Sequence, residues 1–198
     1  MEERIRKRKI VLVGTGFVGM SFAYSLLSEK GINELVLIDM NKDKAVGEQM
    51  DLSDGLPYAD SKMTIKAGEY EECGDADIVV ITAGAAQKPG QTRLELVGIN
   101  ARITKDVATQ VKNSGFKGIL VVASNPVDIM TYVAYKASGL PKEHVIGSGT
   151  ILDTARLRYN ISKRLGMAPS NVHAYILGEH GDSSFVPWIH CYLGCKNL

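Results

Sequence analysis

The sequence is short of cysteine, carries almost no net charge and contains no internal repeat or low-complexity segment. Its 198 residues include three cysteines, Cys73, Cys191 and Cys195, and so sparse and odd a set argues against a disulfide framework and for a reducing cytoplasm. The formal net charge is +1, and no aromatic-rich surface accompanies the basic N-terminal residues, so we expect no nucleic-acid partner. The length suits one globular domain and part of a second.

Long apolar runs are also lacking. The best candidate, Ile10 to Leu27, follows a basic segment but is broken by three glycines and four hydroxyl side chains, and no small-residue cleavage site follows it. We therefore expect neither a signal peptide nor a membrane anchor. His190, Cys191 and Cys195 are close enough in sequence to suggest zinc, but they offer only three ligands. Buried structural thiols are the favoured interpretation, and no metal site is expected.

What the sequence does contain, near its N-terminus, is the order strand, glycine turn, helix, strand. Residues 10–13 are continuously apolar and β-branched, as in a strand covered on both faces. The glycine-rich run 14–19 follows at once, residues 20–28 have helical spacing, and a second apolar run, 35–38, ends on Asp39. This combination predicts a dinucleotide-binding unit, which is a much stronger signal than a lone glycine motif.

Each glycine of this run has a physical task in such a unit. Gly14 makes the tight turn, Gly16 lets the backbone approach a pyrophosphate, and Gly19 lets helix and strand pack closely, while the helix N-terminus presents free N–H groups to the anion. Phe17 and Val18, which lie within this run, are candidate cofactor-binding residues as well. Asp39 is placed to accept hydrogen bonds from a ribose diol. Because its carboxylate would repel a 2′-phosphate, NAD is favoured over NADP.

A phosphate-binding loop of the NTPase type is the competing interpretation of Gly14 to Ser21. That motif needs a lysine to reach the β- and γ-phosphates, and Met20 stands at its position. The NTPase interpretation is therefore disfavoured.

Strands and helices continue to alternate along the chain. We expect helices at 41–52, 93–115 and 126–137, and strands at 62–67, 78–82, 118–123 and 144–146. Such alternation predicts a doubly wound parallel (Rossmann) sheet over residues 1–150, with its ligand at the carboxyl ends of the strands. Ala83, Gly84 and Asn125 fall at such ends together with Gly14 and Asp39, so all are candidate cofactor-binding residues.

The polar loop 84–92 contains hinge-type glycines and leads to Arg93. Its functional interpretation is a mobile cover that excludes water and delivers Arg93 to a bound substrate. Its alternative is an ordinary surface loop with a solvated arginine.

Residues 151–198 are expected to begin an incomplete α+β substrate domain. Helix 151–165 carries Asp153 and Arg156 on one face, with Arg158 about 200° away from Arg156. A strand over 172–177 then leads to His180, which is held between two glycines where it can approach a ligand closely.

Several motifs together resemble those of bacterial L-lactate dehydrogenases, within the lactate/malate dehydrogenase superfamily. They are Gly14-Thr15-Gly16-Phe17-Val18-Gly19, Ile81-Thr82-Ala83-Gly84-Ala85, Ser124-Asn125-Pro126, Gly147-Ser148-Gly149-Thr150 with Leu152-Asp153, and Gly178-Glu179-His180-Gly181. The resemblance covers essentially the whole chain and implies NAD-dependent interconversion of pyruvate and L-lactate, the fermentative end of glycolysis.

The resemblance also implies roles for individual residues. His180 would exchange the proton, which imidazole can do near neutral pH, and Asp153 would orient it. Arg156 would hold the substrate carboxylate, Arg93 would polarise the carbonyl, and Asn125 would bond near the nicotinamide and the substrate. In malate enzymes an arginine precedes the Lys-Pro-Gly of the loop to pair with a second carboxylate. Here that position is Gln87, so pyruvate is expected over oxaloacetate, with malate dehydrogenase as the alternative.

Two further expectations rest on the resemblance. Arg158 and His173 match the arginine and histidine with which some bacterial members bind fructose 1,6-bisphosphate at a subunit interface, and such enzymes are usually homotetramers. Family members also run on for roughly another hundred residues, so the chain is expected to be truncated. A non-catalytic NAD-binding fragment is therefore a second class of function for these residues alone.

Overall fold

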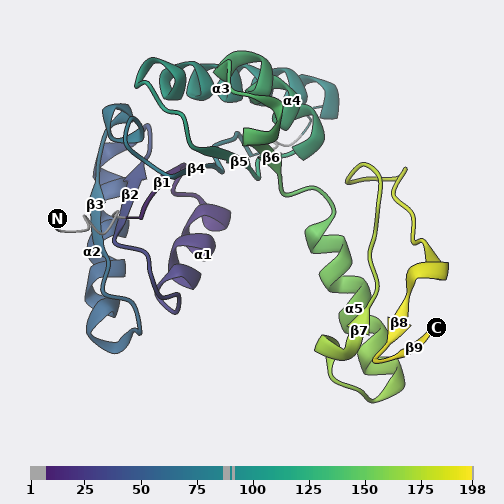
Figure 1. Ribbon diagram of the computed structural model, residues 1–198. Coiled ribbons are helices and arrows are strands. Elements are labelled where there is room, and N and C mark those ends of the chain that lie inside the picture. Colours follow the sequence, from purple (N-terminus) through teal and green to yellow (C-terminus); the bar gives the residue numbers. More distant parts are fainter. Residues whose placement is uncertain (1–7, 87–89, 91, 198) are drawn as a thin grey trace, which may run out of the picture. The chain divides into compact units, whose positions relative to one another are not determined.

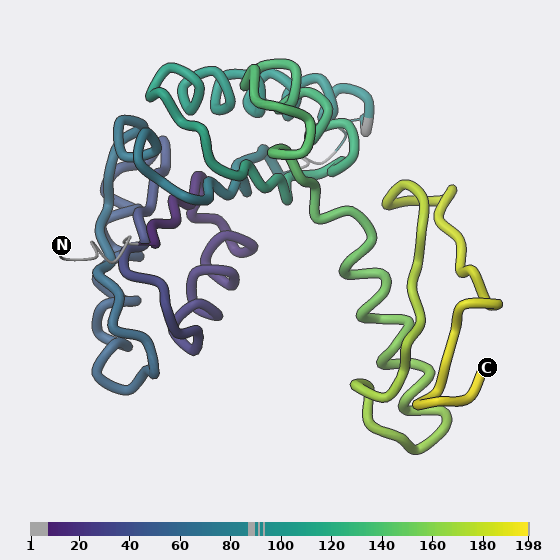
Figure 2. The backbone as a smooth tube through the Cα atoms, in the orientation of Figure 1, coloured from purple at the N-terminus to yellow at the C-terminus, as the bar shows by residue number. Residues whose placement is uncertain are grey.

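The computed structural model describes residues 8–86, 90 and 92–197, the side chain of Arg93 excepted. Its chain divides into two compact units, one ending at Gly147 and the other beginning at Ser148. Figure 1 labels the elements of both units, and Figure 2 follows the backbone through them. Short 3₁₀ helices connect several of the elements: η1 (Leu56–Tyr58), η2 (Tyr70–Cys73), η3 (Lys142–His144), η4 (Pro169–Asn171) and η5 (Trp188–His190).

The first unit is built on a six-stranded parallel sheet with the order β3-β2-β1-β4-β5-β6. Its strands are β1 (Lys9–Val13), β2 (Glu34–Ile38), β3 (Thr64–Ala67), β4 (Ile78–Ile81), β5 (Ile119–Val122) and β6 (Val145–Gly147). The order reverses between β1 and β4, which is the topological switch point of a doubly wound fold. The predicted fold class is confirmed.

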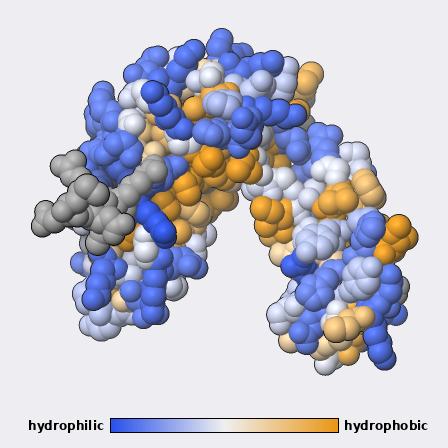
Figure 3. Space-filling model, viewed as in Figure 1, coloured by the Kyte–Doolittle hydropathy of each residue, from blue (hydrophilic) through white to orange (hydrophobic). Residues whose placement is uncertain are grey.

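Helices cover both faces of this sheet: α1 (Phe17–Leu26), α2 (Lys42–Gly55), α3 (Arg93–Asn113) and α4 (Val127–Ser138). Because strand side chains alternate between faces, residues such as Val11 and Ile81 pack against α3 and α4, while Leu12 and Val80 pack against α1 and α2. The outer side of the α3 and α4 layer is largely hydrophilic in Figure 3. The strands are therefore buried on both faces, as their unbroken apolar runs predicted.

The strand register aligns the carboxyl ends that matter for ligand binding. Val13 is opposite Ile38 in β2 and opposite Ile81 in β4, and Ile81 is opposite Val122 in β5. The residues that follow these strand ends therefore lie along one edge of the sheet.

At the opposite edge, Lys9 is a buried lysine with carboxylate partners. Its Nζ donates to Glu72 Oε2 and to Asp75 Oδ1, both at 2.6 Å, and only 6% of its side chain is exposed. Burial alone would lower the pKa of Lys9, but the hydrogen bonds and charges of Asp75 and Glu72 raise it overall. This charged cluster stabilises the start of β1.

Helix α1 begins three residues earlier than predicted. Its N-cap is Gly16, and the first helical bond runs from the Met20 N–H to the Gly16 carbonyl at 2.9 Å. Phe17 and Val18 lie in the first turn with exposed side chains, so hydrophobic periodicity could not include them. The glycine turn and the helix N-terminus therefore overlap, and the unpaired N–H groups of the first turn sit directly at the turn.

The second unit pairs α5 (Ile151–Leu165) with a small antiparallel sheet. The sheet consists of β7 (Val172–His173), β8 (Tyr192–Leu193) and β9 (Lys196–Asn197). Val172, Ala174 and Cys191 form its small core against residues of α5.

The predicted strand over residues 172–177 is wrong for residues 174–176. The next residues stay extended but bond to side chains of α5 rather than to a neighbouring strand: the Ile176 N–H donates to Thr154 Oγ1 at 3.0 Å, and Arg158 Nε donates to the Ala174 carbonyl at 2.9 Å. A strand is defined by backbone pairing, which apolar alternation alone cannot reveal.

The cysteines differ in part from the prediction. Cys73 and Cys191 are buried, and burial raises the pKa of Cys73 to about 12, but Cys195 is exposed. The interpretation as buried structural thiols is therefore wrong for Cys195. In the part of the chain described, no three His, Cys, Asp or Glu side chains gather in a way that could hold a metal ion.

Among the helices of residues 8–86, 90 and 92–197, none combines the length and apolar character that a membrane span requires.

Candidate active site

The glycine turn after β1 is shaped by contacts that exclude side chains. Gly14 has φ +105°, and a Cβ added there would lie 2.6 Å from the Ala83 backbone nitrogen. A Cβ on Gly19 would clash with the Gly14 carbonyl oxygen and with Thr82 Oγ1. A Cβ on Gly16, by contrast, would meet nothing within 4 Å. Gly14 and Gly19 thus make the turn tight, and the space beside Gly16 is open to a ligand.

Asp39 lies beside this turn, and hydrogen bonds hold its carboxylate in place. Its Oδ2 accepts from the Thr15 N–H at 2.8 Å and from Thr15 Oγ1 at 2.9 Å, and its Oδ1 accepts from the Asn41 N–H at 3.0 Å. Burial alone would raise the pKa of Asp39, but these hydrogen bonds and the charge of Lys44 lower it overall. Asp39 is therefore a fixed anion at the carboxyl end of β2.

The loops after β4 and β5 are tied together by two buried polar side chains. Asn100 of α3 accepts from the Ala85 N–H at 2.8 Å and donates to the Asn125 carbonyl at 2.9 Å. Ser124 Oγ donates to the Ala83 carbonyl at 2.6 Å. Ala83, Gly84 and Asn125 are thereby held at one edge of the sheet, and the Asn125 side chain is exposed there.

Arg93 is the first residue of α3, and a capping box fixes the start of that helix. Thr92 Oγ1 accepts from the Glu95 N–H at 3.3 Å, while Glu95 Oε2 accepts from the Thr92 N–H at 3.0 Å. The bonds from Thr92 lower the pKa of Glu95. The Arg93 side chain and the whole of Gln87 lie outside the described residues.

His180 and Asp153 are paired in the second unit. His180 Nδ1 lies 2.6 Å from Asp153 Oδ2, and the side chains are 29% and 20% exposed. A carboxylate at one ring nitrogen orients the imidazole and stabilises its protonated form, which leaves proton exchange with a ligand to Nε2. This pair is suited to general acid–base chemistry.

The loop that carries His180 is closed at its base. Leu177 and Phe185 form an antiparallel bridge in which each backbone N–H donates to the other's carbonyl at 2.9 Å. Gly178 begins the loop with φ +96°, a conformation that favours glycine. His180 is therefore presented from a short, tethered loop rather than from a strand.

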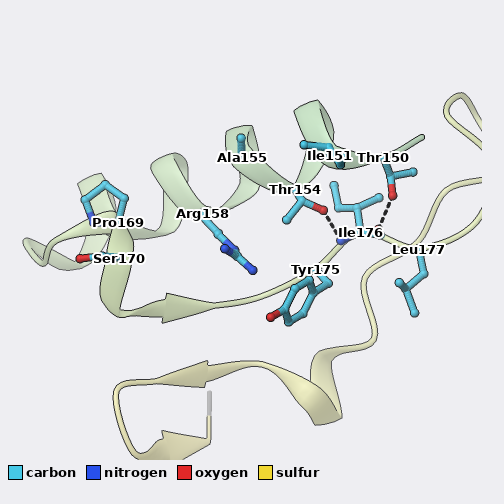
Figure 4. Close-up of a pocket in the computed structure, with 10 residues that line it drawn as sticks. All are labelled: Thr150, Ile151, Thr154, Ala155, Arg158, Pro169, Ser170, Tyr175, Ile176 and Leu177. Atoms are coloured by element: carbon cyan, nitrogen blue, oxygen red, sulfur yellow. Dashed lines mark hydrogen bonds between the residues drawn. The ribbon is translucent and has the colours of Figure 1, made fainter. Parts of the chain in front are cut away.

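Arg156 and Arg158 of α5 lie in different environments, as their helical spacing predicted. Arg156 is exposed, whereas the Arg158 guanidinium lies 4.6 Å from the centroid of the Tyr175 ring. Arg158 and Tyr175 line a pocket of about 650 Å³ beside α5, shown in Figure 4. His173 is exposed on β7.

The structure thus gathers one group of predicted residues in each unit. The first unit brings the glycine turn, Asp39, Ala83, Gly84 and Asn125 to one sheet edge, and the second pairs His180 with Asp153 and places Arg158 in the pocket. The cofactor-binding, catalytic and effector roles of these residues stay predictions.

Sequence reasoning missed the residues that support the site. Thr15, Asn100, Ser124 and the Thr92–Glu95 box all hold backbone or carboxylate groups of the predicted site residues. Only the capping box has a sequence signal, a threonine followed three residues later by a glutamate before an apolar run.

Comparison with known proteins identifies the family. Residues 8–147 match the lactate/malate dehydrogenase NAD binding domain, and residues 150–198 match the lactate/malate dehydrogenase alpha/beta C-terminal domain. The prediction of an NAD-binding domain is confirmed by the first match.

Curated relatives and solved structures agree with this assignment. An L-lactate dehydrogenase of Lactococcus lactis is 54% identical over 195 residues, which are 98% of this chain and 62% of that protein. L-lactate dehydrogenase 2 of Enterococcus faecalis is also 54% identical with the same coverage. A ligand-bound minor L-lactate dehydrogenase of Enterococcus mundtii superposes with a TM-score of 0.94 at 53% identity, covering 97% of this chain and 61% of that one.

A lactate dehydrogenase from a deep-sea metagenome library superposes with a TM-score of 0.93 at 57% identity, covering 98% of this chain and 62% of that one. The chain thus spans less than two thirds of the length of these relatives. With both family models matched along nearly all of its residues, the chain belongs to the lactate/malate dehydrogenase family.

Proposed function

We propose that this protein is an NAD-dependent oxidoreductase that interconverts pyruvate and L-lactate. The observation that carries the proposal is the 2.6 Å pairing of His180 Nδ1 with Asp153, in a chain that also has an NAD-binding domain. We further propose that residues 1–150 form the cofactor domain and residues 151–198 the first part of the substrate domain.

The residues at the carboxyl edge of the sheet fit a dinucleotide. The open space beside Gly16 and the N–H groups of the first turn of α1 suit a pyrophosphate. Asp39, with its lowered pKa, stays ionised at neutral pH and can accept from a ribose diol while repelling a 2′-phosphate. When bound, NADH supplies the hydride for reduction of the carbonyl.

His180 donates a proton to the carbonyl oxygen during reduction and takes it back during oxidation of the alcohol. Asp153 holds the ring through Nδ1, so that Nε2 carries the exchanged proton.

Three other side chains bind and polarise the substrate in this proposal. Arg156 clamps the carboxylate through a bidentate pair, which lysine cannot reproduce. Arg93 stabilises negative charge that develops on the carbonyl oxygen, and Asn125 bonds near the nicotinamide and the substrate. The capping box at Thr92 supports the role of Arg93, because it fixes where α3 begins.

Pyruvate is preferred over oxaloacetate because of Gln87. A neutral amide leaves the second carboxylate of oxaloacetate unpaired, and a buried unpaired charge costs several kcal/mol. The methyl group of pyruvate needs no partner. Malate dehydrogenase is therefore the weaker alternative.

Fructose 1,6-bisphosphate is the proposed effector, bound by Arg158 and His173 at an interface of a homotetramer. Support comes from the pocket beside Arg158 and from the exposure of His173, which leave a guanidinium and an imidazole accessible to a phosphate. A bisphosphate titration should lower the KM for pyruvate, and Arg158→Gln should abolish the response. A KM that does not change with the bisphosphate would refute the effector site.

The cytoplasm is the proposed location, on the basis of the three free thiols.

The function is tested by mixing the purified protein with NADH and following its absorbance with pyruvate or oxaloacetate. Oxidation with pyruvate, and much slower oxidation with oxaloacetate, is the expected result. Since the chain spans 62% of its relatives' length, NADH binding by fluorescence is measured alongside. Binding without turnover would support the second candidate, a non-catalytic NAD-binding chain, and the absence of both would refute the proposal.

A further inference from the structure

Thr150, the N-cap residue of α5, and Thr154 within α5 hold the backbone that leads to His180. Thr150 Oγ1 donates to the Ile176 carbonyl at 2.6 Å, and Thr154 Oγ1 accepts from the Ile176 N–H at 3.0 Å. Figure 4 shows both bonds converging on Ile176, one from Thr150 just before the helix and one from Thr154 within it. Both backbone groups of Ile176 are therefore satisfied by side chains, where a strand would satisfy them with another backbone.

These bonds act at the base of the His180 loop. Ile176 directly precedes Leu177, whose bridge to Phe185 closes that loop. Fixing Ile176 to α5 therefore fixes the loop's entry point to the same helix. In Figure 2 this segment runs beside α5.

Asp153 lies on α5 between the two threonines. The chain thus carries His180 on a loop anchored to α5 at Thr150 and Thr154, and carries its partner carboxylate on α5 itself. A 2.6 Å contact tolerates little displacement of either side, because hydrogen-bond strength falls steeply as distance and angle degrade.

We propose that Thr150 and Thr154 are positioning residues that set the alignment of the His180–Asp153 pair. Their hydroxyl groups act through the Ile176 backbone. The catalytic part of this inference rests on the proposed function, whereas the alignment itself does not.

The chain offers matched variants. Thr154→Val keeps the shape and removes the hydroxyl, and Thr154→Ser keeps the hydroxyl. Ser162→Ala is the control, because Ser162 is a buried hydroxyl of the same helix, eight residues beyond Thr154, that donates to the Tyr159 carbonyl at 2.8 Å. Thr150→Val removes the other bond to Ile176, and it replaces Thr154→Val if that variant fails to fold.

Two readouts need no turnover. Amide hydrogen exchange reports on Ile176, and the downfield imidazole proton resonance of His180, assigned by its loss in Asp153→Asn, reports on the pair. Thr154→Val should speed exchange at Ile176 by about tenfold or more and shift or broaden the imidazole signal. Thr154→Ser and Ser162→Ala should leave the exchange rate at Ile176 and the imidazole resonance of His180 near their wild-type values, whatever the thermal stability of each variant.

Where the wild type turns over, Thr154→Val should lower kcat by about tenfold with unchanged NADH affinity, and Thr154→Ser should restore it. A wild type that binds NADH but does not react would count against the proposed function alone. Wild-type exchange at Ile176 together with a wild-type imidazole signal in Thr154→Val would overturn the positioning role, as would equal changes in Ser162→Ala.

Discussion

Replacing Asp39 with asparagine should destabilise the fold and weaken NADH binding at the same time. The carboxylate accepts the Thr15 N–H, the Thr15 hydroxyl and the Asn41 N–H through its two oxygens. An asparagine has one acceptor oxygen, so its NH₂ group must face either the Thr15 or the Asn41 N–H. Thr15 is 1% exposed, which leaves no water to repair a lost partner there.

The size of the effect follows from the kind of bond that is lost. A hydrogen bond to a charged group contributes about 1.5–3 kcal/mol, and the partial exposure of Asp39 reduces this, so we expect a loss of about 1–2 kcal/mol in the free energy of unfolding at pH 7. NADH should bind about tenfold more weakly, and its advantage over NADPH should shrink because the charge that repels the 2′-phosphate is gone.

The pH dependence gives the sharper test. Because the folded-state pKa of Asp39 is lowered from its ordinary 3.8, its contribution is present above that value and is lost as the pH falls through the folded pKa. Urea unfolding of wild type and Asp39→Asn should therefore differ at pH 7, and the difference should shrink as the pH falls below the ordinary carboxyl value of 3.8. The exposed Asp60, changed to asparagine, is the matched control. A difference within about 0.5 kcal/mol at pH 7, or one that does not shrink as the pH is lowered below 3.8, would refute the reasoning.

Three other predictions follow from single side chains. Lys9→Met should lower the free energy of unfolding by about 1–2 kcal/mol, because it removes the hydrogen-bonded cation that Glu72 and Asp75 share, while Glu72 keeps its pair with Lys66 and Asp75 is 79% exposed to solvent. Since the pKa of Lys9 is raised, urea unfolding should show this penalty fully at pH 7 and shrinking above the ordinary lysine value of 10.5. Gln87→Arg should reverse the preference from pyruvate to oxaloacetate in steady-state kinetics, and an unchanged preference would remove this residue from the specificity argument. Gly19→Ala should weaken NADH binding and lower the melting temperature, because the added methyl meets the Gly14 carbonyl; a variant with wild-type values would show that the turn is not tight.

Periodicity and glycine spacing predicted the first unit well. The apolar runs 10–13 and 35–38 are unbroken because helices cover both faces of the sheet. The composition of these strands therefore reflects their burial. The carboxyl edge followed from topology, since parallel strands end on the same side.

Several features that the sequence did not predict depend on side chains that bond to backbone groups far away along the chain. Ile176 reads as part of a strand, yet it bonds to Thr154 and Thr150, residues more than twenty positions away along the chain. Asn100 likewise lies within a helix whose pattern gives no sign that its amide joins two loops. Cys195 is exposed because it lies in the turn of a short hairpin, which the sequence did not reveal.

The central claim is that His180, oriented by Asp153, exchanges the proton of a nicotinamide-dependent reduction. It is tested most directly by comparing wild type with His180→Gln for NADH binding and for pyruvate-dependent NADH oxidation. The account predicts unchanged NADH affinity and a fall in turnover of about a thousandfold. Turnover by His180→Gln within a few-fold of wild type would contradict it.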